Sequence, residues 1–146
     1  MAREALKPLL PLLVAAALVA CNGSSSPTSV PTAPDLEGEW FGELSDATGT
    51  AALAWLVTSD GNRLVGLALL GGGDVQCEGT MLGQLSGASL SFSMSFPPGA
   101  CPAPLAGCRI EYLGLALATS TTIEGMYNAD DSCRGAISDG RIELRR

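Results

Sequence analysis

The 146-residue sequence contains no histidine and a single lysine, Lys7. It also has no G-x-S-x-G elbow, no phosphate-binding glycine loop and no C-x-x-C pair. Histidine is the commonest general base and lysine supplies the amine of Schiff-base enzymes, so both absences argue against catalysis. Without histidine or C-x-x-C spacing, neither a zinc site nor a thioredoxin-like redox site is expected. We therefore predict a protein that is not an enzyme and that carries no cofactor or metal.

Positive charge is scarce throughout. Beyond residue 20 the chain has six arginines against fourteen acidic residues, a net charge of −8. This balance argues against binding to nucleic acid, which requires a basic surface. It also argues against a domain that lies flat on anionic lipid. We interpret the acidic group Glu37, Glu39, Glu43 and Asp46 as a solvated face.

The first twenty residues have the order of a secretory signal peptide. A basic start with Arg3 and Lys7 precedes the apolar run "PLLPLLVAAALVA", and small residues precede a possible cleavage site before Cys21. The run is too short to span a bilayer comfortably, since a spanning helix needs roughly 20 predominantly apolar residues. We therefore predict that residues 1–20 are an export signal that is removed.

The four residues Leu18-Val19-Ala20-Cys21 resemble the lipobox of bacterial lipoprotein precursors. The resemblance implies that Cys21 becomes the first residue of the mature chain and carries diacylglycerol and an N-linked acyl chain, such as palmitate. Two or more acyl chains give stable membrane anchoring, whereas one gives only marginal binding. Asn22 follows the cysteine where such lipoproteins carry Asp as an inner-membrane retention signal, which favours the outer membrane. The alternative is an ordinary signal peptide that leaves Cys21 as a free thiol.

A polar segment separates this cysteine from the rest of the chain. Residues 21–34 are rich in Ser, Thr and Pro and contain almost nothing that a core could bury, so we predict a disordered linker. The remaining residues, 35–146, are enough for one domain of ordinary size.

The domain contains four cysteines in addition to Cys21, namely Cys77, Cys101, Cys108 and Cys133. An even number in an exported domain predicts two disulfides in an oxidising compartment such as the periplasm. A calcium loop formed by Asn128, Asp130 and Asp131 is the one metal-binding alternative, but the spaced ligand series of a dedicated loop is missing.

Strict alternation of apolar and polar residues dominates the domain and predicts antiparallel β-structure. In "SLSFSMSF" the apolar residues from Leu90 to Phe96 lie on one face and the serines on the other. In "GEWFGEL", Trp40 and Leu44 are predicted inside and Phe41 outside. Turn sequences divide the domain into eight predicted strands: about 38–45, 50–58, 63–70, 79–86, 89–97, 108–118, 121–128 and 134–146, the last with a bulge at Asp139-Gly140.

The hairpin-length connections favour a meander, and eight meandering strands can close into an up-and-down barrel without open edges. A two-sheet sandwich of the same strands is the alternative. In the meander all four domain cysteines fall on one rim. Cys77–Cys101 with Cys108–Cys133 is the preferred pairing, because each bond would close the mouth of one hairpin. Cys101–Cys108 with Cys77–Cys133 stays open, since sequence does not determine connectivity.

Gly38-Glu39-Trp40 on the first strand resembles the G-x-W start of lipocalins and avidin-like barrels. The resemblance implies that Trp40 packs at the closed end of the barrel. It also implies that an arginine of the last strand covers the ring; the candidates are Arg141, Arg145 and Arg146.

Two neighbouring segments, "AALAWLV" and "RLVGLALL", are apolar on both faces. Exposed apolar area usually marks an interaction site, so we predict a surface for a protein partner or for self-association at Leu56, Leu64, Ala68 and Leu70. Two functions follow. The first is a membrane-anchored envelope lipoprotein with a disulfide-linked domain that acts as a structural or interaction module. The alternative is a small-ligand-binding barrel, which we consider second because large inward residues would fill eight strands.

Overall fold

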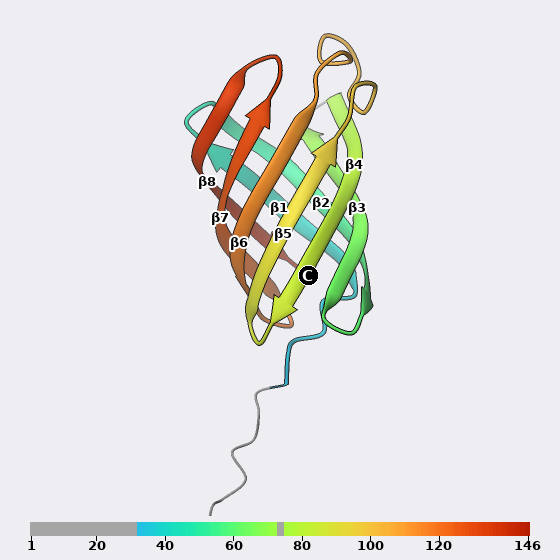
Figure 1. Cartoon of the computed structure of the whole chain (residues 1–146), viewed down its shortest axis with the longest axis vertical. Coiled ribbons are helices and arrows are strands. Elements are labelled where there is room, and N and C mark those ends of the chain that lie inside the picture. The colour runs from blue at the N-terminus through green and yellow to red at the C-terminus, as the bar shows by residue number, and fades with distance from the viewer. Residues whose placement is uncertain (1–31, 73–74) are drawn as a thin grey trace, which may run out of the picture. The chain divides into compact units, whose positions relative to one another are not determined.

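The computed structural model describes residues 32–72 and 75–146, which form eight β-strands and no helix (Figure 1). The predicted signal peptide, Cys21 and residues 22–31 lie outside the described residues. Within residues 32–72 and 75–146 no helix capable of crossing a membrane occurs. The strands are β1 (Gly38–Asp46), β2 (Gly49–Asp60), β3 (Arg63–Gly72), β4 (Val75–Ser86), β5 (Ser89–Phe96), β6 (Ile110–Ala118), β7 (Thr122–Asp131) and β8 (Gly135–Arg145).

The strands form one closed antiparallel barrel in which each strand pairs with its neighbour in sequence. The seam between β1 and β8 completes the closure, with Phe41 opposite Arg145 and Ser45 opposite Arg141. The predicted up-and-down barrel is therefore confirmed, and the two-sheet sandwich is excluded. Closure also explains how eight strands avoid unpaired edges, which would otherwise be available for aggregation.

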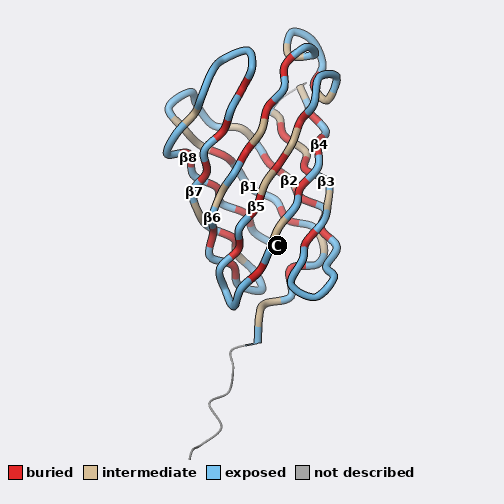
Figure 2. The backbone as a smooth tube through the Cα atoms, viewed as in Figure 1, coloured by how far each residue is buried: buried red, intermediate tan, exposed pale blue. Residues whose placement is uncertain are grey.

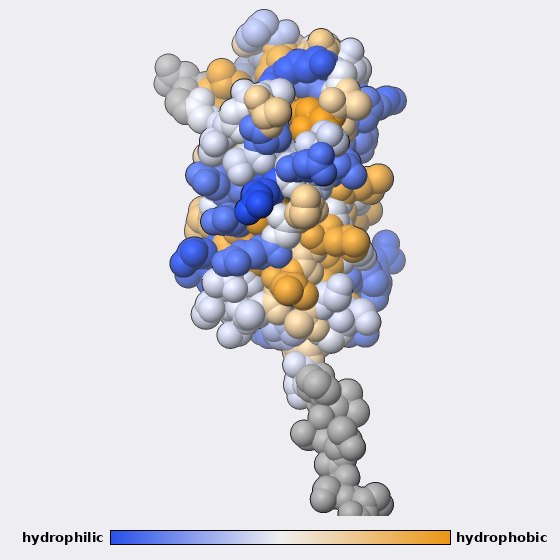
Figure 3. Space-filling view, turned by 90° about the vertical axis from the view of Figure 1, so that its left-hand side faces the viewer, coloured by the Kyte–Doolittle hydropathy of each residue, from blue (hydrophilic) through white to orange (hydrophobic). Residues whose placement is uncertain are grey.

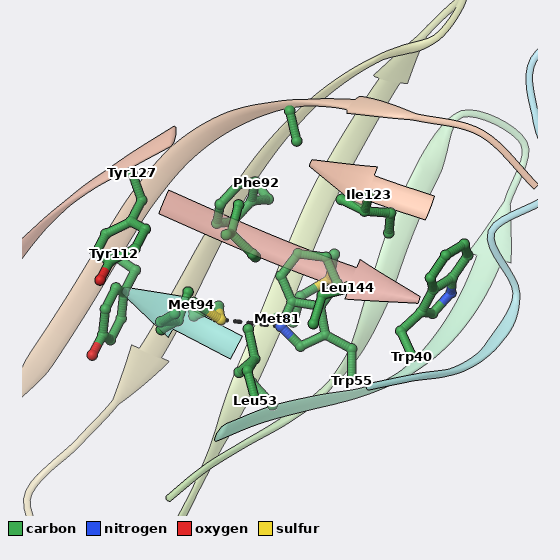
Figure 4. Close-up of a cluster of buried hydrophobic side chains, with 14 of the residues drawn as sticks. Trp40, Leu53, Trp55, Met81, Phe92, Met94, Tyr112, Ile123, Tyr127 and Leu144 are labelled. Atoms are coloured by element: carbon green, nitrogen blue, oxygen red, sulfur yellow. Dashed lines mark hydrogen bonds between the residues drawn. The ribbon is translucent and has the colours of Figure 1, made fainter. Parts of the chain in front are cut away.

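Buried and exposed residues alternate along the strands (Figure 2), and in β1 and β5 the buried face of the large apolar residues is the predicted one. In β5 the four apolar residues are buried, and in β1 Trp40 and Leu44 are buried while Phe41 is 57% exposed. Inward side chains fill the barrel instead of leaving a pore. Bulky residues dominate this filling (Figure 4): Trp40, Leu53, Trp55, Met81, Phe92, Met94, Tyr112, Ile123, Tyr127 and Leu144.

The aromatic side chains inside the barrel touch one another edge to face. Trp55 lies 5.3 Å from Phe92, and Tyr112 lies 5.9 Å from Phe96 and 5.3 Å from Tyr127, measured between ring centroids. The indole nitrogen of Trp55 donates a hydrogen bond to the sulfur of Met94 at 3.1 Å (Figure 4). This hydrogen bond gives the Trp55 indole nitrogen a partner that it would otherwise lack inside the barrel.

Strand ends differ from the predicted ones by up to four residues, and β7 continues to Asp131 instead of residue 128. β4 begins at Val75 instead of residue 79, so Cys77 lies inside this strand. In β8, Ser138 and Asp139 together oppose Asn128 of β7, and Asp139 has a positive φ of 58°. This is a β-bulge at the place where the sequence predicted one, one residue earlier than the Asp139-Gly140 step.

Trp40 lies at the end of the barrel where β1 begins. Its indole nitrogen donates a 2.9 Å hydrogen bond to the carbonyl of Leu36, and its side chain is fully buried. The Arg146 guanidinium lies over the ring, 4.7 Å from its centroid, and donates to the carbonyl of Glu37. Of the three arginines that the sequence offered for this contact, the structure uses Arg146, and this end of the barrel is closed.

Candidate functional site

The opposite end of the barrel carries the turns that precede β2, β4, β6 and β8, and a cavity of about 230 Å³ lies there. The cavity is at the mouth, above the packed interior. Its apolar wall comes from inward residues near the strand ends and from the loop between β5 and β6, through Leu44, Leu70, Leu105 and Ile110. Its polar side chains are Asp46, Thr48, Thr50, Tyr112, Tyr127, Asp131 and Arg134.

Asp46 ends β1 and organises one side of the mouth. Its carboxylate accepts hydrogen bonds from the Thr48 amide at 2.7 Å and from the Tyr127 hydroxyl, also at 2.7 Å. Burial raises the pKa of Asp46, but the hydrogen bonds from Thr48, Tyr127 and the Gly49 amide outweigh it, so the pKa lies below its ordinary value. Asp46 is therefore ionised at neutral pH. Because Asp46 and Tyr127 are 81 residues apart, no local sequence pattern pointed to this pair.

Asp131 is a buried carboxylate, with 2% exposure, at the end of β7. It accepts hydrogen bonds from the amides of Cys133 and Arg134, and its second oxygen lies 3.2 Å from the Arg134 guanidinium. A buried charge is tolerated only when it is paired in this way. Asp131 therefore fixes the β7–β8 turn and is not a free ligand for a cation.

The three residues of the calcium alternative are each bound elsewhere. Asp130 pairs with Arg109 at 3.7 Å, and the Asn128 side-chain oxygen accepts a hydrogen bond from the Asp139 amide. Cys108, Asp131 and Cys133 do have ligand-type atoms within 4.8 Å of one another, but both sulfurs belong to a disulfide. These residues do not form a metal site, since a cysteine binds a metal as a thiolate and not as a disulfide sulfur.

Two disulfides surround the mouth. They join Cys77 to Cys101 and Cys108 to Cys133, with sequence separations of 24 and 25 residues. Cys101 and Cys108 lie in the loop between β5 and β6, so each bond ties that loop to a different neighbouring hairpin. The Glu78 amide also donates to the Ala100 carbonyl at 2.9 Å. The loop that carries Leu105 into the cavity wall is thereby held at both of its ends.

Both tyrosines of the chain lie at this mouth, and both have raised pKa values. Burial, followed by the negative charge of Asp46, raises the pKa of Tyr112 to about 12. Burial and the hydrogen bond to Asp46 raise the pKa of Tyr127 further. A phenol is neutral in its protonated form, so both side chains are neutral donors near pH 7.

We expect a spectrophotometric titration at 295 nm to show no phenolate step near pH 10, with the first step at about pH 12. In denaturant both tyrosines should titrate near pH 10. Because the pKa values are higher in the folded protein than in the unfolded chain, the folded state favours the protonated tyrosines. Their contribution to the free energy of unfolding is fully present below pH 10 and is lost as the pH rises towards 12. The Tyr112→Phe variant should lose the step at about pH 12. A step near pH 10 in the folded protein would contradict the burial of these hydroxyls.

The outer wall of the barrel carries a row of exposed leucines on β6. Leu113, Leu115 and Leu117 are exposed by 68%, 66% and 68%, and Met126 on β7 lies opposite Leu115 with 53% exposure. We call these four residues the β6 leucine row. The serines of β5 border the row on its other side, since Ser91 pairs with Leu115 and Ser93 with Leu113. The view in Figure 3 shows that apolar side chains also reach the surface among hydrophilic ones on the face it displays.

The interaction surface predicted on β2 and β3 is wrong for three of its four residues. Leu64, Ala68 and Leu70 are exposed by 2%, 0% and 7% and point into the barrel, whereas Leu56 is 49% exposed. The outward residues of β3 include Val65 and Leu67. The physical reason is the pairing with β2. The inward residue Trp55 lies opposite Ala68, so Ala68 also points inward, together with Leu64 and Leu70 on the same face of β3.

No protein-family model, curated protein or solved structure matches this chain.

Proposed function

We propose that this chain is an envelope lipoprotein, anchored in the outer membrane through Cys21, whose β-barrel is a structural or interaction module and not an enzyme. The signal-like residues 1–20 and the lipobox motif support the anchor. Two disulfides in one small domain fit an oxidising compartment. The packed interior supports a module, since it leaves no room for a ligand along the barrel axis.

The β6 leucine row is the observation that carries the interaction role. Three consecutive outward positions of one strand are leucines, each about two-thirds exposed to solvent. Full burial of one such side chain is worth roughly 1.5–3 kcal/mol, and contiguous exposed apolar area marks interaction sites. The occupant is a protein surface, either of a partner or of a second copy of this chain.

A photo-crosslinking amino acid at position 115 tests this role in intact cells. We expect a discrete crosslinked product from position 115, and its mass will distinguish a second copy from a different protein. The matched control is position 43, because Glu43 is also outward and exposed but lies on β1. No product from position 115, or the same product from both positions, would contradict an interaction through the β6 leucine row.

The anchor has its own test. We expect the Cys21→Ala variant to move from the detergent phase to the aqueous phase in detergent partitioning, because it lacks the acylated thiol. Exchange of Ser24, three residues further along, for alanine should leave partitioning unchanged. A Cys21→Ala protein that remained in the detergent phase would show that lipidation at Cys21 is not what holds the chain to the membrane.

A further inference from the structure

The hydroxyl of Tyr112 lies at the mouth without a hydrogen-bond partner in the folded barrel. Tyr112 is 7% exposed, lines the cavity, and forms no hydrogen bond through its hydroxyl with residues 32–72 or 75–146. Figure 4 shows the hydroxyl oxygens of Tyr112 and Tyr127 at the end of the buried cluster away from Trp40, which is the mouth end. No side-chain polar atom of the described residues is both fully buried and unpartnered, so this hydroxyl is accessible from the cavity and can pair with a molecule that enters it.

The charged groups around the cavity, and the hydroxyl of Tyr127, are already bonded. The Tyr127 hydroxyl donates a hydrogen bond to Asp46, and the Asp46 carboxylate also accepts one from the Thr48 amide. Asp131 and Arg134 form an ion pair with each other. The charges are therefore compensated within the protein, whereas the neutral Tyr112 hydroxyl still offers one donor and acceptor positions. A molecule that carried its own charge would have to break one of these pairs.

The size and walls of the cavity limit the molecule further. A cavity of about 150 Å³ with aliphatic and aromatic walls holds benzene, and drug-sized ligands occupy about 300–1,000 Å³. The mouth cavity of about 230 Å³ lies between these values. Tyr112 and Tyr127 already pack edge to face, and a further ring would extend that packing towards Leu105.

We propose that the mouth of the barrel binds a small uncharged ring compound with one hydroxyl or N–H group, and that this group hydrogen-bonds to the Tyr112 hydroxyl. The apolar part of the compound lies against Leu44, Leu70, Leu105 and Ile110. The disulfides hold the β5–β6 loop, and with it the Leu105 wall, so the site exists before the ligand arrives. This binding is separate from the β6 leucine row, which lies on the outer wall.

Binding of phenol to the full-length protein in lipid nanodiscs tests the site, with toluene as the probe that lacks the hydroxyl and benzoate as the charged probe. Empty nanodiscs correct for partition into lipid. By ligand-observed NMR we expect phenol and toluene to bind and benzoate to bind at least tenfold more weakly than phenol. The Tyr112→Phe variant should bind phenol roughly 3- to 10-fold more weakly than the wild type and bind toluene equally well, because only the hydrogen bond is lost.

Two alanines on β2 provide a matched pair of blocking variants. Ala51 lines the cavity and is partly buried, whereas Ala52 is exposed and points the other way. Ala51→Phe should abolish phenol binding, and Ala52→Phe should not change it. The proposal is overturned if phenol does not bind the wild-type protein, if Ala51→Phe still binds it, or if Tyr112→Phe binds phenol as tightly as the wild type. None of these results bears on crosslinking at position 115.

Discussion

Exchange of Trp40 for alanine is expected to lower the free energy of unfolding by about 3–5 kcal/mol. The side chain is fully buried at the closed end of the barrel, donates to the Leu36 carbonyl and is covered by Arg146. Its removal would leave a cavity and would deprive both neighbours of a contact. Guanidinium denaturation followed by far-ultraviolet circular dichroism measures the change.

The adjacent residue gives the control for this experiment. Phe41 is also aromatic, lies on the same strand and is 57% exposed, so Phe41→Ala should cost less than about 1 kcal/mol. Arg146→Ala should cost about 0.5–1 kcal/mol, the value of an exposed cation–π contact. Equal losses for Trp40→Ala and Phe41→Ala would contradict the closed end described above.

Exchange of Gly42 for alanine is expected to be the most damaging small substitution, with a loss of more than about 4 kcal/mol or failure to fold. A Cβ atom at this position would overlap the carbonyl oxygen of Glu143 and lie 2.9 Å from the Cα atom of Leu144. Both atoms belong to the backbone of β8, so relief requires the seam between β1 and β8 to separate. Losses of this size arise from a short list of mechanisms, of which backbone strain is one.

Gly107 provides the matched control, because a Cβ atom there meets nothing within 4 Å and the residue lies in the β5–β6 loop. The free energy of unfolding of Gly107→Ala should be within about 0.5 kcal/mol of the wild-type value. Thermal unfolding of both variants under identical conditions gives the comparison. A Gly42→Ala protein as stable as Gly107→Ala would mean that β1 and β8 do not approach as closely as the structure places them.

The barrel was predictable because its strands carry the period-two pattern and its turns carry glycine and polar residues. β5 is the clearest case, since serines fill one face and apolar residues the other, and period two then leaves a single orientation. Meander topology followed from the short connections. The same reasoning predicted that Trp40 is inside and Phe41 outside, as the structure confirms.

β3 shows where this reasoning fails. Both faces of the strand are apolar, so period two shows which residues share a face but not which face is inside. The decision depends on neighbouring strands, where Trp55 and Met81 fill the interior next to Ala68 and Gly66. Small residues are needed opposite large ones inside a narrow barrel. The mouth cavity was missed for a related reason, because Asp46, Tyr112 and Tyr127 meet only through the closed topology.

The seam between β1 and β8 also dictates when this protein can fold. It pairs residues 41–45 with residues 141–145, so the two strands that close the barrel are separated by almost the whole domain. Such long-range pairing makes folding slow, because the entropy of closing a long loop opposes it. During synthesis β1 emerges first, and β1 must wait for β8 before the barrel can close. The barrel therefore closes only after β8 is available, when Arg146 can also reach Trp40.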